Sequence, residues 1–244
     1  MALSHIEARI DLACALRWAV RLGLHEGVCN HFSIAVSGAN GDAFLINPHG
    51  CHWSEITASS LVLCDASGRI IEGDNSVEDT AFFIHSNIHV MAPQAKVIMH
   101  THMPYTTSLT LLKGGCLEMC EQNALMFDDR IAYDDDYTGL ALDENEGKRM
   151  ATKLGNNSIL FLASHGVVVT GTSIAQAFTD LYYLERASMF QVLARSTGGS
   201  LRTISGQVRE TVKRQFSVDL PNLASRHFKA LKRILDNEEE GYRA

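Results

Sequence analysis

The sequence predicts one α/β domain, in which strands and helices are mixed along the whole chain. A length of 244 residues suffices for one such domain with a full core, or at most for two small ones. Hydrophobic residues make up 46% of the chain and charged residues 20%, as in an ordinary globular protein. Short apolar runs alternate with segments of helical periodicity, and neither an internal repeat nor a linker interrupts them. We therefore expect residues 1–244 to fold as a single domain.

Composition also restricts the partners and the compartment. The formal net charge is −7 and no basic stripe occurs, which argues against a nucleic-acid partner. No apolar run approaches the roughly 18–20 residues that span a bilayer, and the N-terminus lacks the features of a signal peptide. The six cysteines are scattered without a Cys-x-x-Cys motif, so reduced thiols are expected. These features predict a cytoplasmic protein that does not bind membranes.

The N-terminal third is expected to pass from a helix into short strands. Ser4 to Glu7 has the pattern of a capping box, with Ser4 as N-cap of a helix that ends at Gly23. Alternating apolar residues and Gly-rich turns then predict strands over 28–36, 43–47, 61–65 and 69–72, with a hairpin turn over 37–42. Helical periodicity returns over 78–91. His85 and His89 lie four residues apart there, and we interpret them as packing or pocket residues.

The rest of the chain alternates in the same way. The pattern predicts a strand over 97–102, a short helix that begins at Pro104, and a helix over 143–154. A strand ending at His165 is expected to pair with 167–170, and Ser173 to cap a long helix. The segment 116–138 is less periodic, and we interpret its acidic residues as a solvated loop: Asp128, Asp129, Asp134, Asp135 and Asp136. Beyond residue 199 only 223–235 indicates a helix.

Three histidines predict a metal site. His100 and His102 are two residues apart on the strand that begins at Val97, so their side chains point to the same face. His165 ends another apolar strand and is followed by Gly166. Three imidazoles that leave further coordination positions open are the ligand set of a catalytic metal. Imidazole suits zinc, manganese or iron, and we expect one Mn²⁺ or Zn²⁺ per subunit.

The ordered motifs resemble the class II aldolase/adducin family over about residues 5–195. The resemblance is carried by these stretches: 27–33, 46–50, 56–62, Ala92-Pro93, 97–102 and 164–167 with Gly171. It implies a three-layer α/β/α fold with a mostly antiparallel central sheet, and a homotetramer with sites near subunit boundaries. In enzymes of this family, histidines that match His100, His102 and His165 hold the divalent metal. Residues 196–244 lie outside the resemblance and are expected to form a C-terminal helical extension.

The chain departs from the family at the acid/base position. In the aldolases the metal polarises a carbonyl and its neighbouring hydroxyl and so stabilises the enediolate, while a glutamate acts as acid/base. An alignment without gaps places Ala81 at that glutamate. The nearest suitable acid is Glu78, about one helical turn earlier, and it is our candidate for the role. Tyr105 and Tyr133 are further candidates as proton donors.

The substrate-binding positions depart as well. Positions of the phosphate cradle in the aldolases hold Val28, Asn30, His31 and His49 here, and Thr80 is the one hydroxyl kept. Loss of hydroxyl donors disfavours a phosphomonoester, whereas imidazoles are able to receive carboxylates. Arg130 is a carboxylate-binding candidate by its chemistry. The predicted substrate-binding residues are His31, His49, Gly50, His52, Thr80 and Arg130.

Three functions remain open from the sequence. The first hypothesis is a metal-dependent carbon–carbon lyase, a decarboxylase of a hydroxy- or oxo-substituted dicarboxylate such as a hydroxypyridine dicarboxylate. Decarboxylation needs an acid that protonates the carbanion, but it does not need the base that removes a hydroxyl proton in the aldolases. An alanine at position 81, where the aldolases have that base, is therefore compatible with a decarboxylase. The alternative is a class II aldolase that cleaves a sugar or sugar phosphate, as fuculose-phosphate aldolases do. The second alternative is a non-catalytic, adducin-like assembly module, against which the three retained histidines argue.

Overall fold

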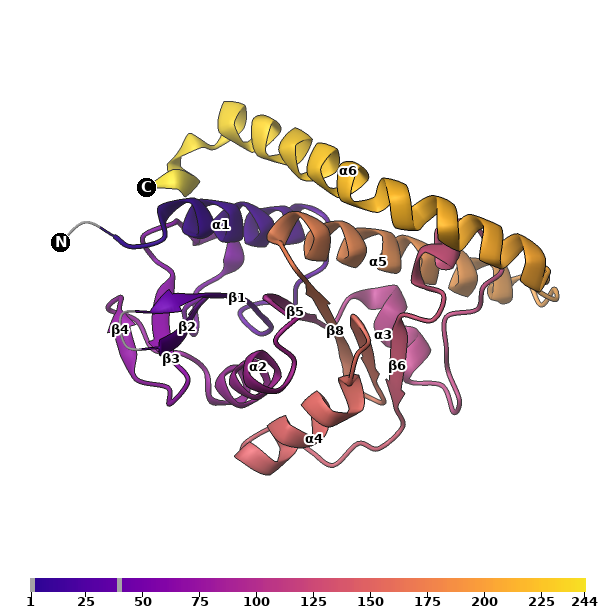
Figure 1. The fold of residues 1–244 in the computed structure, drawn as a ribbon, viewed down its shortest axis with the longest axis horizontal. Helices are drawn as coiled ribbons and strands as arrows, with labels where there is room; N and C mark the ends of the chain where they lie inside the picture. Colours follow the sequence, from indigo (N-terminus) through magenta and orange to yellow (C-terminus); the bar gives the residue numbers. More distant parts are fainter. Residues whose placement is uncertain (1–2, 39–40) are drawn as a thin grey trace.

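A computed structural model describes residues 3–38 and 41–244, and within them eight strands form one sheet between two layers of helices (Figure 1). The strand order is β4-β3-β2-β1-β5-β8-β7-β6. Only β6 and β7 pair in parallel; all other neighbouring strands are antiparallel. The expected three-layer arrangement with a mostly antiparallel sheet is confirmed. The strands are β1 His31–Gly38, β2 Gly41–Ile46, β3 Val62–Asp65, β4 Ile70–Glu72, β5 Val97–Thr101, β6 Ile131–Asp134, β7 Ile159–Leu162 and β8 Gly166–Gly171.

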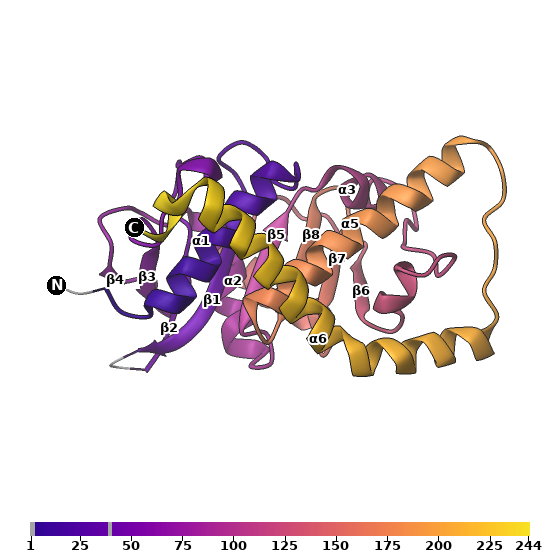
Figure 2. The same ribbon diagram turned by 90° about the horizontal axis from the view of Figure 1, so that it is seen from above.

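The helices divide between the two faces of the sheet (Figures 1 and 2). Helices α1 and α5 cover one face and α6 lies across them, whereas α2 and α4 pack side by side on the other face. The α-helices are α1 Ile6–Arg21, α2 Asp79–Met91, α3 Pro104–Thr110, α4 Glu144–Leu154, α5 Ile174–Ser196 and α6 Gly206–Glu238. Short 3₁₀ turns are η1 Trp53–Glu55, η2 Ala124–Phe127 and η3 Glu240–Arg243. None of the helices in the described residues has the length and apolar character that crossing a membrane requires.

The central strand β5 is buried along its whole length, and its side chains alternate between two cores. Val97 and Met99 belong to the larger core, which includes apolar residues of α1 and α5. Ile98 belongs to the smaller core with Ile84 of α2 and Met150 of α4. Since side chains of a strand alternate between faces, His100 points to the same face as Ile98. The sequence of β5 therefore directs the first metal-ligand candidate toward α2 and α4.

The start of α1 corrects the predicted capping box. His5 is the N-cap, with a left-handed φ of 55°, and no side chain caps the helix. The backbone of Ser4 is held instead by Arg9 of α1 and by Glu72 of β4. Its carbonyl accepts a hydrogen bond from Nε of the fully buried Arg9 at 2.8 Å, and its N–H donates to the Glu72 carboxylate at 3.3 Å. A contact with Arg9 in the same helix and a long-range contact with Glu72 have thus replaced the predicted cap.

The segment 116–138 is more ordered than its sequence predicted. It contains η2 and the edge strand β6, and the solvated-loop interpretation is wrong for two of its aspartates. Asp128 is buried and accepts hydrogen bonds from Arg209 of α6. Asp134 is buried and pairs with Arg149 of α4 at 2.5 Å. A buried carboxylate needs such a partner, and both partners are distant in sequence. The remaining three aspartates of the segment are exposed, as predicted.

Helix α6 is much longer than the helix predicted over 223–235. It begins after Ser205, whose hydroxyl accepts a hydrogen bond from the N–H of Val208. Its buried residues are Ala224, Phe228, Leu231 and Leu235, which all lie in the C-terminal half. Apolar residues recur at four-residue spacing in the N-terminal half as well, as Val208, Val212, Phe216 and Leu220, so the sequence carried a helical pattern that the prediction missed. Pro221, usually a helix breaker, lies inside this helix. The predicted hairpin between β1 and β2 forms, but its strands extend into the turn predicted over 37–42, because Ser37 pairs with Asp42 and Gly38 with Gly41. Residues 39–40 lie outside the described residues.

Substitution of Gly147 by Ala should destabilise the fold, because α2 and α4 approach closely at this glycine. An added Cβ would lie 2.2 Å from the carbonyl oxygen of Phe83 and 2.6 Å from Nδ2 of Asn87. We expect a loss of about 1–3 kcal/mol in the free energy of unfolding, measured by urea titration. Gly206→Ala is the control, because no atom lies within 4 Å of its added Cβ. Equal stability of the two variants would contradict this packing.

Candidate metal centre

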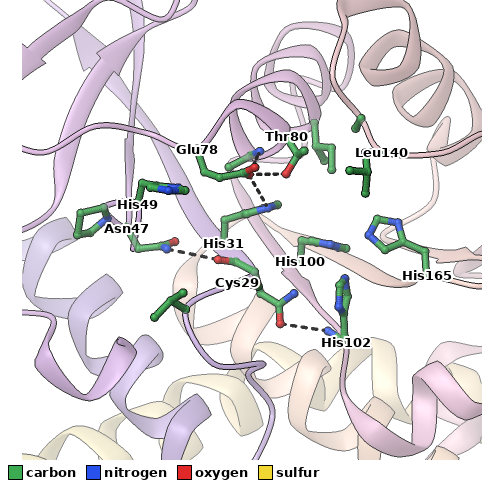
Figure 3. A pocket seen from close by; sticks show the side chains of 16 residues that line it. Cys29, His31, Asn47, His49, Glu78, Thr80, His100, His102, Leu140 and His165 are labelled. Atoms are coloured by element: carbon green, nitrogen blue, oxygen red, sulfur yellow. Dashed lines mark hydrogen bonds and ion pairs between the residues drawn. The ribbon is translucent and has the colours of Figure 1, made fainter. Parts of the chain in front are cut away.

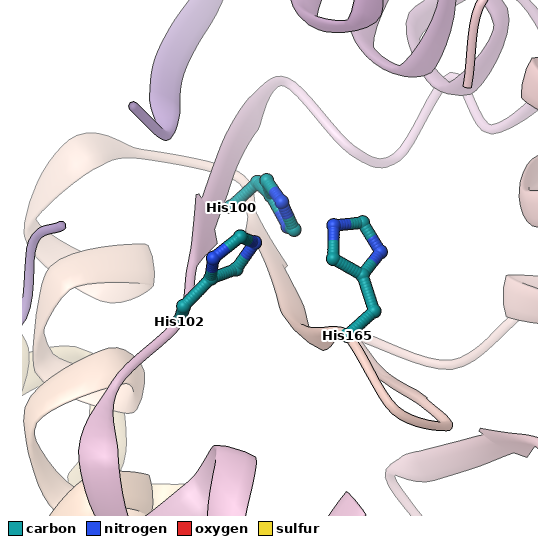
Figure 4. A group of neighbouring side chains, drawn as sticks. All are labelled: His100, His102 and His165. Carbon is teal, nitrogen blue, oxygen red and sulfur yellow. The ribbon is translucent and has the colours of Figure 1, made fainter. Parts of the chain in front are cut away.

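Three histidines converge where the end of β5 adjoins the start of β8, two central strands of the sheet (Figure 4). One ring nitrogen of each of His100, His102 and His165 lies within 4.8 Å of the others. His100 belongs to β5 and His102 follows its last residue, whereas His165 lies in the turn between β7 and β8. The antiparallel pairing of Thr101 with Val167 brings the end of β5 next to the start of β8. The predicted ligand candidates thus come together, and binding of a metal by them stays a prediction.

The residue after His165 must be glycine for this convergence. A Cβ on Gly166 would lie 2.6 Å from the carbonyl oxygen of Thr101 and 2.7 Å from Cδ2 of His102. Distances below 3.0 Å to backbone would force the strands apart. Ser164, just before His165, has a φ of 57°, which turns the chain sharply between the two strands. The tight turn and the missing side chain together let His165 approach the other two imidazoles.

Hydrogen bonds orient two of the three rings. Nδ1 of His100 donates to the carbonyl oxygen of Val167 at 3.0 Å. Nδ1 of His102 donates to the carboxylate of Glu26. Both bonds leave the Nε2 lone pair free, and Nε2 of His102 is buried without a hydrogen-bond partner. Such outer partners are characteristic of metal-binding histidines, so the residues present fit a divalent metal.

Burial keeps two imidazoles of this cluster, those of His100 and His165, neutral, which is the protonation state that binds metal. Burial lowers the pKa of His165 to about 4, and the neighbouring His102 adds to the effect. The pKa of His100 is well below its ordinary value for the same reasons, first burial and then the adjacent imidazoles. No proton therefore has to leave these two rings before a cation binds near neutral pH.

A cavity of about 280 Å³ adjoins the three histidines (Figure 3). Four predicted site residues lie in its wall with them: His31, His49, Glu78 and Thr80. The remaining wall is largely apolar and includes Ile84, Leu140 and Ala141. The cavity thus combines a few polar groups with apolar surface, as small-molecule sites commonly do.

Glu78 enters the cavity as the N-cap of α2. Its carboxylate accepts hydrogen bonds from the N–H of Ala81 at 2.9 Å and from the hydroxyl of Thr80. Burial alone would raise the pKa of Glu78. The bonds from Thr80 and Ala81 and the nearby His31 outweigh burial and hold this pKa below its ordinary value. Glu78 is therefore ionised near neutral pH, and Ala81, at the aldolase glutamate position, lines the same cavity.

Two predicted carboxylate-binding or proton-donating residues do not line the cavity. The guanidinium of Arg130 pairs with the fully buried carboxylate of Asp180 at 2.5 Å, so its charge is already neutralised within the fold. The hydroxyl of Tyr133 accepts a hydrogen bond from the N–H of Leu117 at 3.2 Å, and burial raises its pKa to about 12. The residue types alone could not indicate that Asp180 and Leu117 would be the partners of Arg130 and Tyr133.

Three further predicted residues also lie outside the cavity wall. His52 caps η1, and its Nε2 lies 3.1 Å from Nε2 of His25. Gly50 turns the chain with a φ of 73°. Tyr105 begins α3 next to Pro104, and its N–H donates to the buried carboxylate of Glu185 at 2.8 Å. These residues support the loops around the site.

Two residues of the site had no functional assignment from the sequence. Glu26 orients His102, but nothing in its sequence context indicates that contact. Asn30 lines the cavity and has a positive φ of 72°, a conformation that Asn tolerates better than most residues. Its Oδ1 accepts a hydrogen bond from the N–H of His102 at 3.3 Å, while its Nδ2 is buried without a partner. This amide is a free donor beside the metal-ligand candidates.

Comparison with known families decides the affiliation. The model of the Class II Aldolase and Adducin N-terminal domain family matches residues 10–192, which is most of the chain. The chain belongs to this family. The relation was predicted from the ordered motifs and is confirmed.

Individual proteins support the same affiliation. An aldolase II superfamily protein from Pseudomonas syringae is 32% identical, with a TM-score of 0.91 over 100% of this chain and 98% of that one. L-fuculose 1-phosphate aldolase from Glaciozyma antarctica has a TM-score of 0.85 over 100% and 96% of the chains, but its 24% identity shows the fold alone. An adducin-related protein from Schizosaccharomyces pombe is 31% identical over 98% of this chain and 76% of its own. The proteins to which this chain is similar thus include one named for an enzyme, by fold, and one named for adducin, by sequence.

Removal of the Glu26 carboxylate should weaken metal binding. Glu26→Ala takes away the acceptor that holds Nδ1 of His102, and we expect about 10- to 100-fold lower zinc affinity in competition with a chelator. Glu210→Ala, which removes an exposed carboxylate from α6, is the matched control. Unchanged affinity in Glu26→Ala would show that this contact does not orient a metal ligand.

Proposed function

We propose that this protein is a divalent-metal-dependent carbon–carbon lyase that cleaves a small hydroxylated carbonyl compound by aldol chemistry. The observation that carries this proposal is that three converging imidazoles and an ionised carboxylate, Glu78, share one cavity. Membership of the class II aldolase and adducin family supports a lyase-type enzyme. The neighbouring fuculose-phosphate aldolase adds support from the fold.

Each part of the cavity has a role in this reaction. His100, His102 and His165 would hold the metal. When bound, a divalent metal acts as a Lewis acid that polarises a carbonyl. The carboxylate of Glu78 accepts the proton of a substrate hydroxyl as the carbon–carbon bond breaks, and returns a proton to the carbon left behind. The buried apolar wall residues Ile84 and Ala141 keep water away from the carbanion on their side of the cavity.

Aldol cleavage takes precedence over decarboxylation for two reasons. The sequence favoured decarboxylation because Ala81 stands at the acid/base position, but the carboxylate of Glu78 lies in the same cavity. The expected carboxylate receptor His31 is fully buried, and burial lowers its pKa to about 3. A neutral imidazole supplies no positive charge for a second carboxylate. Decarboxylation is the second candidate, because Ala81 stands at the position of the aldolase acid/base glutamate.

We also propose that the chain forms a homotetramer, which its family membership supports. Such an assembly brings a neighbouring subunit close to each cavity. Light scattering after size-exclusion chromatography measures the mass of the particle directly. The mass of a monomer would refute the tetramer, but it would not contradict the proposed lyase function.

Purified protein should contain one divalent metal per chain, measured by inductively coupled plasma mass spectrometry. His100→Ala should lose the metal, because it removes one of three converging ligands. His49→Ala, which changes another imidazole of the cavity wall, should keep the metal. Absence of metal from the unmodified protein, even after incubation with Mn²⁺ or Zn²⁺, would refute both lyase functions and favour an adducin-like assembly module.

Glu78→Gln should retain the metal and lose turnover by about 10²- to 10⁴-fold, because an amide cannot accept the hydroxyl proton. Asp79→Asn removes the same charge one residue later, on an exposed side chain outside the cavity, and should be nearly fully active. The assay panel comprises cleavage of L-fuculose and of its 1-phosphate, and CO₂ release from a hydroxypyridine dicarboxylate. Release of CO₂ without any cleavage of the sugars would select the decarboxylase.

A further inference from the structure

A chain of buried hydrogen bonds leads from the cavity into the layer between β1 and α2. His31 and Ser33 are two residues apart on β1 and share one face of the strand. His85 and His89 are four residues apart on α2 and share one face of the helix. The two pairs interleave. Nδ1 of His31 lies 3.0 Å from Nε2 of His85, and Nδ1 of His85 lies 2.6 Å from Oγ of Ser33. The same Oγ lies 2.8 Å from Nε2 of His89.

One backbone carbonyl sets the direction of all these bonds. Nδ1 of His89 lies 3.0 Å from the carbonyl oxygen of Ala95, which is able only to accept. Nδ1 of His89 must therefore carry a hydrogen, and Nε2 of a neutral His89 is left as an acceptor. The single hydrogen of the Ser33 hydroxyl then points to His89. Since Ser33 has no second hydrogen, Nδ1 of His85 must donate to it.

The same reasoning reaches the cavity. With its hydrogen on Nδ1, a neutral His85 has only an acceptor at Nε2, so Nδ1 of His31 must donate to it. A neutral His31 is then left with a bare lone pair at Nε2. That nitrogen lies 3.8 Å from Oε2 of Glu78, and both groups belong to the cavity. The ring of His31 also stacks on that of His100, with centroids 5.0 Å apart and an angle of 28°.

Burial supports the neutral state that this count of hydrogens requires. His31 and His85 are almost completely inaccessible to solvent, and His89 is largely enclosed between Ser33 and Ala95. Burial lowers the pKa of His89 to about 4 and that of His31 to about 3, and it holds the pKa of His85 well below its ordinary value. A second proton on His85 or His89 would place two donors face to face within the chain. A second proton on His31 would instead face the Glu78 carboxylate at 3.8 Å, so the neutral state of His31 follows from its burial, which outweighs the attraction of that carboxylate.

We propose that His31 is a specificity-determining residue whose tautomer is locked by the chain His85–Ser33–His89–Ala95, so that it offers the substrate only an acceptor. Next to it stands a second acceptor, the Glu78 carboxylate. The pair selects a substrate that carries hydroxyl donors beside the metal-ligand candidates, and it discriminates against carboxylate or phosphate oxygens at this place. This inference rests on the proposed function, whose substrate class it specifies, and it replaces the expectation that His31 receives a carboxylate.

The tautomer is measured by long-range ¹⁵N–¹H NMR of histidine-labelled, zinc-loaded protein, with His31→Gln and His89→Gln used for assignment. The expected result is Nδ1–H with an unprotonated Nε2 for His31, His85 and His89. Free imidazole side chains in water favour the opposite tautomer, so the result is diagnostic. An Nε2–H signal from His31 would overturn the proposal.

Interruption of the chain tests whether it sets the tautomer. Ser33→Ala removes the link between His85 and His89, and His31 should then populate both tautomers. Ser33→Thr keeps the hydroxyl and should keep the single tautomer. An unchanged His31 signal in folded Ser33→Ala would overturn the role of the chain. If Ser33→Ala does not fold, the tautomers of the unmodified protein and of Ser33→Thr still decide the question.

Ligand preference is tested with dihydroxyacetone and pyruvate, which share a three-carbon skeleton and a carbonyl but differ in hydroxyl and carboxylate groups. Zinc-loaded protein should bind dihydroxyacetone about 10-fold more tightly or better in calorimetric titration. His31→Gln should abolish most of this preference, because an amide rotates to donate or accept. Equal or tighter pyruvate binding to the unmodified protein would overturn the inference. Absence of turnover with the His31 tautomer intact would refute only the lyase function.

Discussion

The antiparallel register of β5 with its two neighbours is the constraint on which the rest of the site depends. On one side His100 lies opposite His31 of β1, and on the other it lies opposite Val168 of β8. The first pairing stacks two imidazoles, and the second supplies the Val167 carbonyl that orients His100. A shift of one residue in this register would turn His100 into the opposite core. The apolar residues of β5, buried on both faces, make such a shift costly.

Two glycines allow the close backbone contacts that hold the elements around the site together. Gly166 lets β8 start against Thr101 and His102, and Gly147 lets α4 pack against α2. Burial then fixes the chemistry of the imidazoles, because an unpaired buried proton is expensive. Nδ1 of each of His100, His102 and His89 points at a carbonyl or carboxylate acceptor. The resulting lone pairs at Nε2 face the metal position, the cavity or a serine hydroxyl. Packing thus determines hydrogen positions as well as side-chain positions.

Sequence reasoning succeeded where the information was local. Strand and helix periodicity predicted the elements around the site, including β5 and α2, and two-residue spacing predicted that His100 and His102 share a face. It failed where a partner came from far along the chain. The solvated-loop interpretation of Asp128 and Asp134 missed arginines of α6 and α4. Arg130 carried the right chemistry, but Asp180 of α5 engages it. Likewise, the four-residue spacing of His85 and His89 was visible, whereas their link through Ser33 requires α2 to pack on β1.

The acid/base position shows how a family scaffold accommodates a changed residue. Ala81 and Glu78 are three residues apart at the start of α2, so they lie on the same side of its first turn and both line the cavity. A carboxylate at an N-cap is stabilised as an anion by free N–H groups, here that of Ala81, and by the hydroxyl of Thr80. A glutamate inside the helix at position 81 would lack this support and would be a stronger base. The Glu78 carboxylate therefore caps the N-terminus of α2 and also faces the cavity. The hydrogen bonds that it accepts from the helix lower its basicity.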